Sequence, residues 1–274
     1  MKKDIFYKIE KLKKILKRMG SVLVAYSGGV DSSFLLKVAK DVLGEDLLAV
    51  TAVSPTYTQR ELIIARNFTD KQKIKHLIIR TAEYRNILFR KNSPLRCYWC
   101  KRELFLKLKE IAKKYRINYV IDGANYDDLS DFRPGERAKR ELGVRSPLQE
   151  AGLKKEEIRY LSKRLRLPSY NYPAQACLAS RIPYGEKISI YKLRRIEKAE
   201  SFLQRLGFLQ VRIRAYTDLA RIEVEKDKIS LLIKNSSKII SFLKKLGFSY
   251  ITVDLEGYRR GSMNISLKKN FYDG

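Results

Sequence analysis

A short apolar stretch at residues 22–26 leads directly into a glycine-containing loop, and this junction constrains the fold more than any other part of the chain. The loop reads Ser-Gly-Gly-Val-Asp-Ser-Ser at residues 27–33, and residues 34–40 follow with a helical pattern. Glycine lacks a Cβ and lets the backbone approach an anion closely. The free N–H groups at the start of a helix favour phosphate. The sequence therefore predicts a strand, a phosphate-binding loop and a helix in succession.

The side chains of this loop indicate a nucleotide bound together with a metal ion. The serine hydroxyls are further donors to phosphate, whereas the carboxylate of Asp31 would repel phosphate unless Mg²⁺ bridges the two. The loop lacks the Gly-Lys-Ser/Thr ending of a Walker A sequence, and the alternative interpretation is an ordinary Gly-Ser turn. We expect Asp31 to bind Mg²⁺. The expected nucleotide ligands in the loop are Ser27, Gly28, Gly29, Asp31, Ser32 and Ser33.

Strand and helix patterns alternate through the first half of the chain. Strand patterns occur at 22–26, 47–53, 76–80 and 119–122, and helical patterns lie between them at 32–43, 59–72 and 99–115. This alternation predicts an α/β fold with a doubly wound, mostly parallel sheet. Ligands of such sheets bind at the carboxyl ends of the strands. Both the Ser-Gly-Gly loop and Asp122-Gly123 follow such ends.

The second half of the chain has a different organisation. Prolines cluster within residues 167–186, which indicates a functional linker. Beyond it we expect a helix at about 189–206, strands at 209–215 and 220–225, one or two helices at about 227–246, and a strand at 250–255. Leu-Gly-Phe closes a predicted helix at 206–208 and again at 246–248, where glycine suits the helix stop. We therefore expect two domains, 1–168 and 169–274, of which the second is a smaller α+β domain.

The chain is strongly basic, with 58 Lys+Arg against 30 Asp+Glu and a formal net charge of +28. Such a charge is typical of a protein that binds RNA, but the lysines are spread along the predicted helices, as on a lysine-rich solvated surface. Residues 1–20 have the periodicity of an amphipathic helix and lack the apolar core of a signal peptide. No apolar run of about 18 residues is present. We expect a cytoplasmic protein without a membrane span.

A second polar segment follows the strand pattern at 119–122. Residues 122–135 contain four aspartates within ten positions, and Mg²⁺ prefers carboxylate and water oxygens. The alternative is a polar surface loop of turn-forming residues. Together with the upstream loop, the segment indicates nucleotide and metal binding. The expected ligands are Asp122, Gly123, Asn125 and Asp127, with Asp127 as a second Mg²⁺ ligand.

The chain has three cysteines, of which Cys97 and Cys100 form a Cys-x-x-Cys and Cys177 lies far away. An odd number without a secretory signal argues against a disulfide framework. A redox dithiol, an iron–sulfur cluster with one open iron and three unrelated buried thiols all remain open. A structural zinc site needs four N or S ligands. The single histidine, His76, lies in a strand pattern and is more typical of a satisfied core or surface residue.

Several of these segments resemble known families. The loop at 27–33 resembles the PP-loop of the ATP pyrophosphatases, SGGxDS, and the cysteine segments are similar to those of the LarE family. Members of that family are ATP-dependent sulfur transferases that help make the nickel-pincer cofactor of lactate racemase. The resemblance covers nearly the whole chain, with similar strings at 27–33, 96–101, 122–128, 133–135, 145–148, 173–185, 218–223 and 254–264.

The resemblance implies a PP-loop fold and a substrate, pyridinium-3,5-biscarboxylic acid mononucleotide. ATP would adenylate a carboxylate, with its adenine at the backbone of 47–53. Pyrophosphate would leave, and sulfur would then displace AMP. In one kind of member, a cysteine at the position of Cys177 gives up its own sulfur; in the other, three cysteines bind a 4Fe-4S cluster whose open iron carries sulfide. This chain resembles the cluster kind, with Asp31, Cys97, Cys100 and Cys177 as its expected catalytic residues.

The implied substrate carries a phosphate and two carboxylates, which suit the arginine fork. Arg212 and Arg214 alternate along a predicted strand and so face one side. The alternative is a set of surface arginines paired with glutamates, for instance Arg212 with Glu223. Trp99 would stack on an aromatic ring or pack internally, and Glu200 would orient an arginine or bind a metal. By resemblance the substrate-binding residues are Trp99, Ser180, Arg181, Glu200, Arg212 and Arg214, with Arg221 and Arg259 as weaker candidates.

The resemblance also implies partners. These are an upstream carboxylase, a downstream nickel-inserting enzyme and further copies of the chain in a homo-oligomer. Two other functions remain open. A tRNA-thiolating PP-loop enzyme would explain the net charge, although the sequence shows no further Cys-x-x-Cys pair or recognisable RNA-binding domain. A non-enzymatic iron–sulfur carrier or ATP-sensing module is the third alternative.

Overall fold

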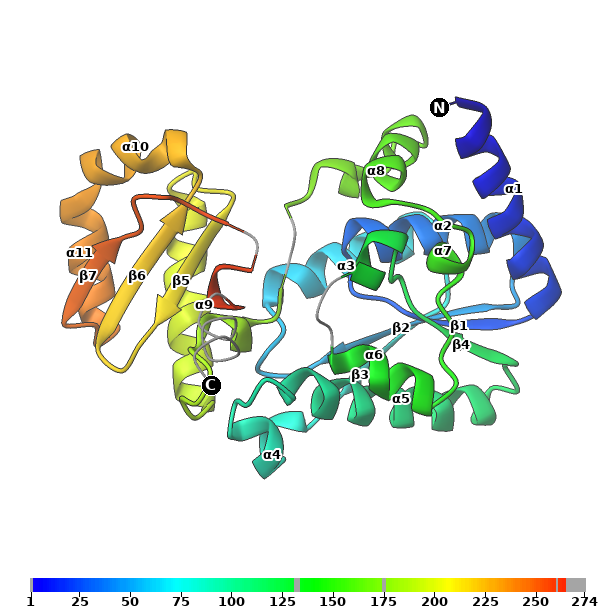
Figure 1. Ribbon diagram of the computed structural model, residues 1–274, viewed down its shortest axis with the longest axis horizontal. Helices are drawn as coiled ribbons and strands as arrows, with labels where there is room; N and C mark the ends of the chain where they lie inside the picture. The colour runs from blue at the N-terminus through cyan, green and yellow to red at the C-terminus, as the bar shows by residue number, and fades with distance from the viewer. Residues whose placement is uncertain (1, 131–133, 174–175, 260, 265–274) are drawn as a thin grey trace. The chain divides into compact units, whose positions relative to one another are not determined.

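The computed structural model describes residues 2–130, 134–173, 176–259 and 261–264 (Figure 1). It divides into two compact units, Met1–Phe89 with Pro94–Gln175 and Arg90–Ser93 with Ala176–Gly274. Each unit has its own sheet. No described helix is both long and apolar enough to cross a membrane. Among the residues quoted for the family resemblance, Arg133, Ala174, Gln175 and Arg260 lie outside the described residues, as does Asp131 of the aspartate-containing segment.

The first unit is built on a parallel sheet of four strands in the order β3-β2-β1-β4. Its strands are β1 (Val22–Ala25), β2 (Leu47–Val53), β3 (His76–Arg80) and β4 (Tyr119–Ile121). Val22 of β1 lies opposite Leu47 of β2 and Tyr119 of β4, so the central strands begin level with one another. The helices up to residue 164 are α1 (Lys2–Met19), α2 (Val30–Leu43), α3 (Gln59–Lys71), α4 (Ile87–Arg90), α5 (Arg96–Lys114), α6 (Pro134–Glu141), α7 (Pro147–Glu150) and α8 (Lys155–Arg164).

Helices cover both faces of this sheet. Val22 and Val24 of β1 pack into one core together with α1 and α2, whereas Leu23 packs into a second core with α5. Successive strand residues point to opposite faces, so a buried apolar run such as β1 supplies both cores at once. Figure 1 shows α1 and α2 on one side of the strands and α5 on the other. The predicted α/β organisation with a parallel sheet is confirmed.

Helix α3 begins where a capping box satisfies its first turn. The Thr58 hydroxyl accepts a hydrogen bond from the Glu61 amide at 3.2 Å, and the Glu61 carboxylate accepts one from the Thr58 amide at 2.9 Å. These contacts satisfy backbone donors that a helix start otherwise leaves unpaired. The helix buries Ala65 and Phe68 against the core that also contains α2. This places α3 beside the loop that follows β1.

The second unit has a three-stranded sheet in the order β5-β6-β7. Strands β5 (Val211–Ala215) and β6 (Leu219–Val224) are antiparallel, and β7 (Tyr250–Val253) pairs with β6 in parallel. Its helices are α9 (Ile190–Arg205), α10 (Ile229–Lys234) and α11 (Ser236–Lys245). The rings of Phe202 and Phe242 stack at 4.0 Å and join α9 to α11.

The structure corrects several of the predicted helix bounds. The helix predicted at 32–43 begins at Val30, and the one predicted at 99–115 begins at Arg96. The Cys-x-x-Cys therefore lies within the first two turns of α5. Helices α4, α6 and α7 were not predicted, because four to eight residues are too few to show a helical period. The segment predicted as a linker contains two short 3-10 helices, Pro168–Asn171 and Leu178–Arg181.

Candidate functional site

The strand order of the first sheet reverses beside β1. The chain goes from β1 to β2 and β3 on one side, and returns to β4 on the other. In open α/β sheets, ligands bind at the carboxyl ends of the strands where the order reverses. The loop at 27–33 follows β1 there, and Asp122-Gly123 follows β4. The fold thus brings the two predicted nucleotide segments to the same edge of the sheet.

The loop after β1 folds closely over the start of α2. Gly29 is the N-cap residue, and its carbonyl accepts the Ser33 amide at 2.9 Å. The hydroxyls of Ser27 and Ser32 lie 3.1 Å apart. Gly28 has a φ of +75°, and a Cβ there would lie 3.5 Å from the Ala65 Cβ of α3. Glycine suits this position because it adopts positive φ without strain.

Ser33 differs from the other two serines of the loop in the partner of its hydroxyl. Ser32 and Ser33 are both buried, but the Ser33 hydroxyl lies 3.3 Å from that of Tyr26 in the core. Ser27 is exposed, and Tyr57 donates a hydrogen bond from its hydroxyl to the Ser27 carbonyl at 2.9 Å. The hydroxyl of Ser33 is therefore engaged inside the fold.

Gly123 brings the end of β4 against the same helix start. A Cβ at this position would lie only 2.9 Å from the Ser32 amide nitrogen and 3.0 Å from its Cα. Real Cβ atoms do not approach backbone so closely, so any side chain at residue 123 would displace one of the two segments. The absence of a side chain at Gly123 is thus what allows the segment after β4 to reach α2.

Asp31, in the first turn of α2, is linked to the segment after β4 by Lys155. The Lys155 ammonium forms a short ion pair with Asp31, and the Lys155 amide donates to the Asp127 carboxylate at 2.8 Å. Burial raises the pKa of Asp31, partly offset by Lys155. Asp31 Oδ1 is buried and has no hydrogen bond of normal geometry among the described residues, although Asn125 lies close enough to favour the charged form. A cation at this carboxylate would satisfy its free oxygen.

The other predicted ligands of this segment hold it in place. Asp122 accepts a short hydrogen bond from the Ser146 hydroxyl, and the buried Lys139 ammonium donates to that hydroxyl at 2.8 Å. The backbone N–H of Asn125 donates a hydrogen bond to the Asp128 carboxylate at 3.1 Å. No three His, Cys, Asp or Glu side chains converge as a metal site within the part of the chain that the structure describes. Mg²⁺ commonly needs only one or two carboxylates when phosphates supply further oxygens, so Asp31 and Asp127 fit such an ion.

All three cysteines are thiols and not disulfides. Cys97 and Cys100 are half-buried in the first two turns of α5, and residues three apart share a helix face. A Cβ on Gly135 of α6 would lie 3.6 Å from the Cys97 carbonyl, so the two helices meet at this turn. Cys177 is exposed in the second unit, immediately before the 3-10 helix at Leu178–Arg181. The ring of Trp99 makes an edge contact with Tyr98 at 4.9 Å.

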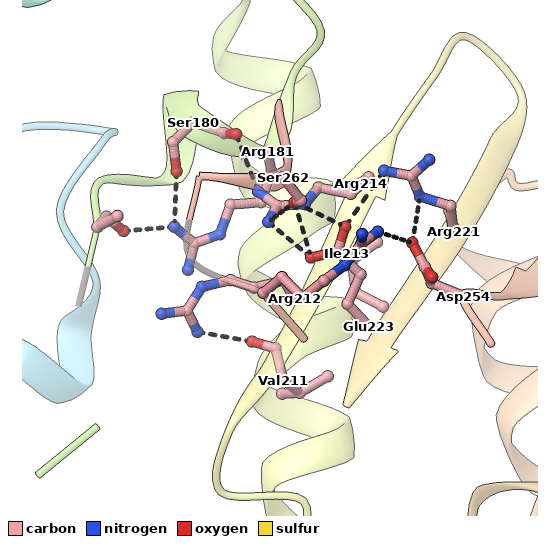
Figure 2. A network of polar contacts seen from close by, with 12 residues as sticks. Ser180, Arg181, Val211, Arg212, Ile213, Arg214, Arg221, Glu223, Asp254 and Ser262 are labelled. Atoms are coloured by element: carbon pink, nitrogen blue, oxygen red, sulfur yellow. Dashed lines mark hydrogen bonds and ion pairs between the residues drawn. The ribbon is translucent and has the colours of Figure 1, made fainter. Parts of the chain in front are cut away.

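The second unit gathers the predicted substrate arginines on a buried network (Figure 2). The guanidinium of Arg181 forms two hydrogen bonds of 2.9 Å with the Glu200 carboxylate. Glu200 also accepts the Ile213 amide of β5 at 2.9 Å. Burial alone would raise the pKa of Glu200, but Arg181 and Arg212 outweigh it and hold that pKa below its ordinary value. Glu200 on α9 thus orients Arg181 and fixes it to the sheet.

Glu223 is the second carboxylate of this network, and it is fully buried. It binds Arg214 at 2.6 Å and Arg221 at 3.2 Å, and the Ser262 hydroxyl lies 3.1 Å from it. Arg214 also donates to the Ser180 carbonyl at 3.1 Å. The register places Arg212 opposite Glu223 across the strands, but the ion pairs of Glu223 are formed with Arg214 and Arg221.

Arg212 contacts a backbone carbonyl and an aromatic ring. One of its nitrogens donates to the Val211 carbonyl at 2.7 Å, and its guanidinium lies 5.2 Å from the ring centre of Tyr258. Burial lowers the pKa of Arg212, and the neighbouring Arg181 lowers it further. Bringing an anion to such a group relieves both effects, as in arginine sites for phosphate and carboxylate.

Sequence reasoning missed three residues at these sites. Lys155 lies 124 residues from Asp31 in the chain, and nothing distinguished it among 58 lysines and arginines. Tyr57 lies 30 residues from its partner Ser27 in the chain, and Ser262 lies 48 residues from its partner Arg214. Only the fold brings these contacts together.

Comparisons with known proteins bear on the whole chain. No protein-family model matches it. It is 36% identical over 256 residues to the pyridinium-3,5-bisthiocarboxylic acid mononucleotide synthase of Lactiplantibacillus plantarum, and the match covers 93% of this chain and 92% of that protein. The chain belongs to the LarE family.

Other relatives extend this family placement. An uncharacterized protein of Synechocystis, slr1717, is 44% identical over 96% of the chain and 98% of its own length. One of the subunits of the glutamine-hydrolyzing GMP synthase of Archaeoglobus fulgidus is 28% identical over 57% of the chain and 55% of its own length. About half of this chain is thus similar to a protein named as a GMP synthase subunit.

Proposed function

We propose that the protein is an ATP-dependent sulfur transferase that converts the carboxylates of pyridinium-3,5-biscarboxylic acid mononucleotide into thiocarboxylates. The observation that carries this proposal is the 36% identity, over almost the whole chain, to a protein named as the synthase of the bisthiocarboxylic acid. The product in that name differs from the biscarboxylic acid by sulfur in place of oxygen. The similarity to GMP synthase subunits supports a PP-loop ATP pyrophosphatase fold for the first unit.

The loop after β1 would hold the triphosphate of ATP. Its backbone and the hydroxyls of Ser27 and Ser32 lie at the start of α2, where free N–H groups favour phosphate. Asp31 and Asp127 would hold a Mg²⁺ ion, which would neutralise the phosphate charge. The adenine would lie against the backbone of β2. This arrangement would leave the α phosphorus open to the incoming carboxylate, with the bond to pyrophosphate on the opposite side.

Adenylation solves the main chemical difficulty of the reaction. A carboxylate is a poor electrophile, because attack would expel oxide. Its oxygen attacks the α phosphorus of ATP, and pyrophosphate leaves. A sulfur nucleophile then attacks the acyl carbon, the C–O bond to AMP breaks, and the thiocarboxylate and AMP result. Water would destroy the acyl adenylate, so the chain must exclude it from this step.

The second unit would bind the substrate anions. Arg212 and Arg214 lie on the same strand and the same face, with Arg181 and Ser180 near them in the network of Figure 2. Their guanidinium groups match phosphate and carboxylate oxygens in pairs. Glu200 and Glu223 would keep Arg181 and Arg214 in place before the substrate arrives. Trp99 would stack on an aromatic ring of the substrate or ATP.

The three cysteines would supply the sulfur site. Thiols suit an iron–sulfur cluster, and Cys97 and Cys100 share one helix face. Cys177 would be the third ligand. When bound, such a cluster would supply a sulfide from the iron that no cysteine holds. The alternative is a Cys177 that gives up its own sulfur once.

A tRNA-thiolating enzyme is the second candidate function, because the net charge of +28 favours a polyanion. It would use the same adenylation on a base of the RNA. By its resemblance to the family, the first function implies an upstream carboxylase and a downstream nickel-inserting enzyme as partners. We also propose a cytoplasmic homo-oligomer.

The test is pyrophosphate release from ATP by the anaerobically purified full chain. We expect release only when the biscarboxylate mononucleotide is present, and a loss of at least about a hundredfold in Asp31→Ala because its metal ligand is gone. The matched control is Asp41→Ala, which removes an exposed carboxylate on the same helix. Release that depends on tRNA and not on the mononucleotide would overturn the proposal in favour of the second candidate.

A further inference from the structure

The single histidine of the chain is hydrogen-bonded through both ring nitrogens. His76, the first residue of β3, has Nδ1 3.0 Å from the Thr69 hydroxyl of α3 and Nε2 2.8 Å from the Thr51 hydroxyl of β2. Its ring meets that of Tyr26 edge-on, with 5.9 Å between the ring centres. The imidazole therefore joins α3, β2 and the end of β1.

The proton positions in this group follow from the hydroxyls. Thr51 donates its only hydroxyl proton to the Tyr26 carbonyl at 2.9 Å, so it must accept a proton from His76 Nε2. In a neutral imidazole, Nδ1 is then an acceptor. The Thr69 hydroxyl shares its one proton between Nδ1 and two backbone carbonyls, those of Arg66 at 2.9 Å and Ala65 at 3.1 Å. Burial lowers the pKa of His76, Arg66 lowers it further and Asp70 raises it, so the ring is neutral near neutral pH. The result is a relay from the Thr69 hydroxyl through His76 and Thr51 to the Tyr26 carbonyl.

Both ends of this relay adjoin the phosphate-binding loop. Tyr26 is the last residue before Ser27, and its amide is also bound, to the Val50 carbonyl at 2.9 Å. At the other end, Thr69 lies one turn after Ala65, and its hydroxyl is 3.1 Å from the Ala65 carbonyl. Ala65 is the residue against which Gly28 packs. The relay thus fixes the position of Tyr26, where the loop begins, and of Ala65, which packs beside Gly28.

We propose that His76 is a positioning residue for the phosphate-binding loop, acting through Thr51 on the Tyr26 carbonyl and through Thr69 on α3. This proposal rests on the proposed use of ATP by the loop. Small displacements of groups that orient a reacting ligand cost large factors in binding or rate. His76 touches no phosphate itself. Its effect is to hold the Gly28 and Gly29 amides in the geometry that a triphosphate requires.

The first test is nitrogen NMR of the imidazole in the full chain, which is selective because there is only one histidine. We expect the Nε2–H tautomer near neutral pH, and a shift of both ring signals when magnesium and ATP are added. A ring in the Nδ1–H tautomer would overturn the relay. Ring signals that stay unchanged while ATP demonstrably binds would overturn its connection to the loop.

The second test compares ATP affinity, measured by calorimetry, in two variants. His76→Leu removes both hydrogen bonds and should weaken ATP binding about tenfold, while the affinity for the mononucleotide stays unchanged. His76→Gln keeps a donor toward Thr51 and should recover part of the loss. The control is Leu12→Ala, which destabilises the buried face of α1 and should leave ATP affinity unchanged.

The outcomes separate the two proposals. If wild type binds ATP and His76→Leu binds it equally well, the relay is wrong and the proposed function stands. If wild type does not bind ATP, both are wrong. If His76→Leu does not fold, Thr51→Val removes only the hydroxyl next to Tyr26 and must show the same selective loss of ATP affinity.

Discussion

The buried charge of Asp31 is unfavourable to folding, and the same carboxylate is the proposed ligand of Mg²⁺. Its carboxylate is largely buried in the first turn of α2, and burial raises its pKa in spite of the Lys155 ammonium. A raised pKa means that the folded state penalises the charged form. The penalty is absent below the ordinary pKa of 3.8 and complete above the raised pKa. Without metal and nucleotide, Asp31 therefore reduces stability near neutral pH.

Asp31→Asn should accordingly make the ligand-free protein at least as resistant to heat as wild type near neutral pH. The advantage should shrink as the pH falls through the raised pKa, because the wild-type carboxylate then takes up a proton. Magnesium and ATP should stabilise wild type strongly and the variant little, since the metal ligand is lost. Thermal unfolding with and without ligand, at several pH values, measures both effects. A variant that is less stable at neutral pH yet still stabilised by ligand would contradict this account.

Single residues were predictable where a local string carries the chemistry. Ser27, Gly28 and Gly29 follow a strand pattern, and the fold places them at the strand end where the sheet order reverses. Lys155 was not predictable, because its contact with Asp31 depends on how α8 packs on α2. The ion-pair partners of Glu223 were not predictable either, because the fold decides that they are Arg214 and Arg221.

At the scale of elements, a buried ion pair joins α9 to the 3-10 helix Leu178–Arg181, and a hydrogen bond joins α9 to β5. Glu200 of α9 binds Arg181 with two hydrogen bonds and accepts the Ile213 amide of β5. Removing one partner of a buried pair leaves the other charge uncompensated, which costs about 3–5 kcal/mol. The depressed pKa of Glu200 adds a pH dependence. Its contribution is present above the ordinary pKa of 4.5 and is lost as the pH falls through the lower pKa of the folded state.

Glu200→Gln should therefore lower the unfolding free energy by about 3–5 kcal/mol near neutral pH. The difference from wild type should narrow in acid, because wild type then loses the same charge. Urea unfolding at neutral and acidic pH provides the measurement. The control is Glu186→Gln, which breaks a partly exposed pair with Lys192 in the same unit and should cost at most about 1 kcal/mol. If the two variants lose equal unfolding free energy, the buried pair stabilises the fold no more than the partly exposed pair does.

Elements were predictable in proportion to the length of their apolar pattern. Strands β2 and β3 have the predicted bounds, because each is a run of apolar and β-branched residues between turn signals. The short helices α6 and α7 escaped prediction, since packing and not periodicity decides them. The start of α5 was missed by three residues because Cys97 and Trp99 give no helical period of their own.

At the scale of the whole molecule, the charge of +28 exceeds what a small anionic substrate needs. In the second unit, Arg181, Arg214 and Arg221 pair with Glu200, Glu223 and Asp254, so these three arginines account for little of that excess. The two described units divide the proposed work between a loop for ATP and a network for the substrate anions. The proposed sulfur transfer depends on Cys97 and Cys100 of the first unit and on Cys177 of the second.

The most direct measurement counts sulfur-containing products per chain. The protein is reconstituted anaerobically with iron and sulfide, supplied with ATP, magnesium and the biscarboxylate mononucleotide, and analysed by mass spectrometry together with a Cys97→Ala variant. The account predicts several thiocarboxylate products per wild-type chain, an unchanged protein mass, and loss of repeated turnover in the variant. A single product per chain, with a loss of roughly 34 Da from Cys177, would mean that the cysteine itself is consumed. No thiocarboxylate at all would contradict the central claim.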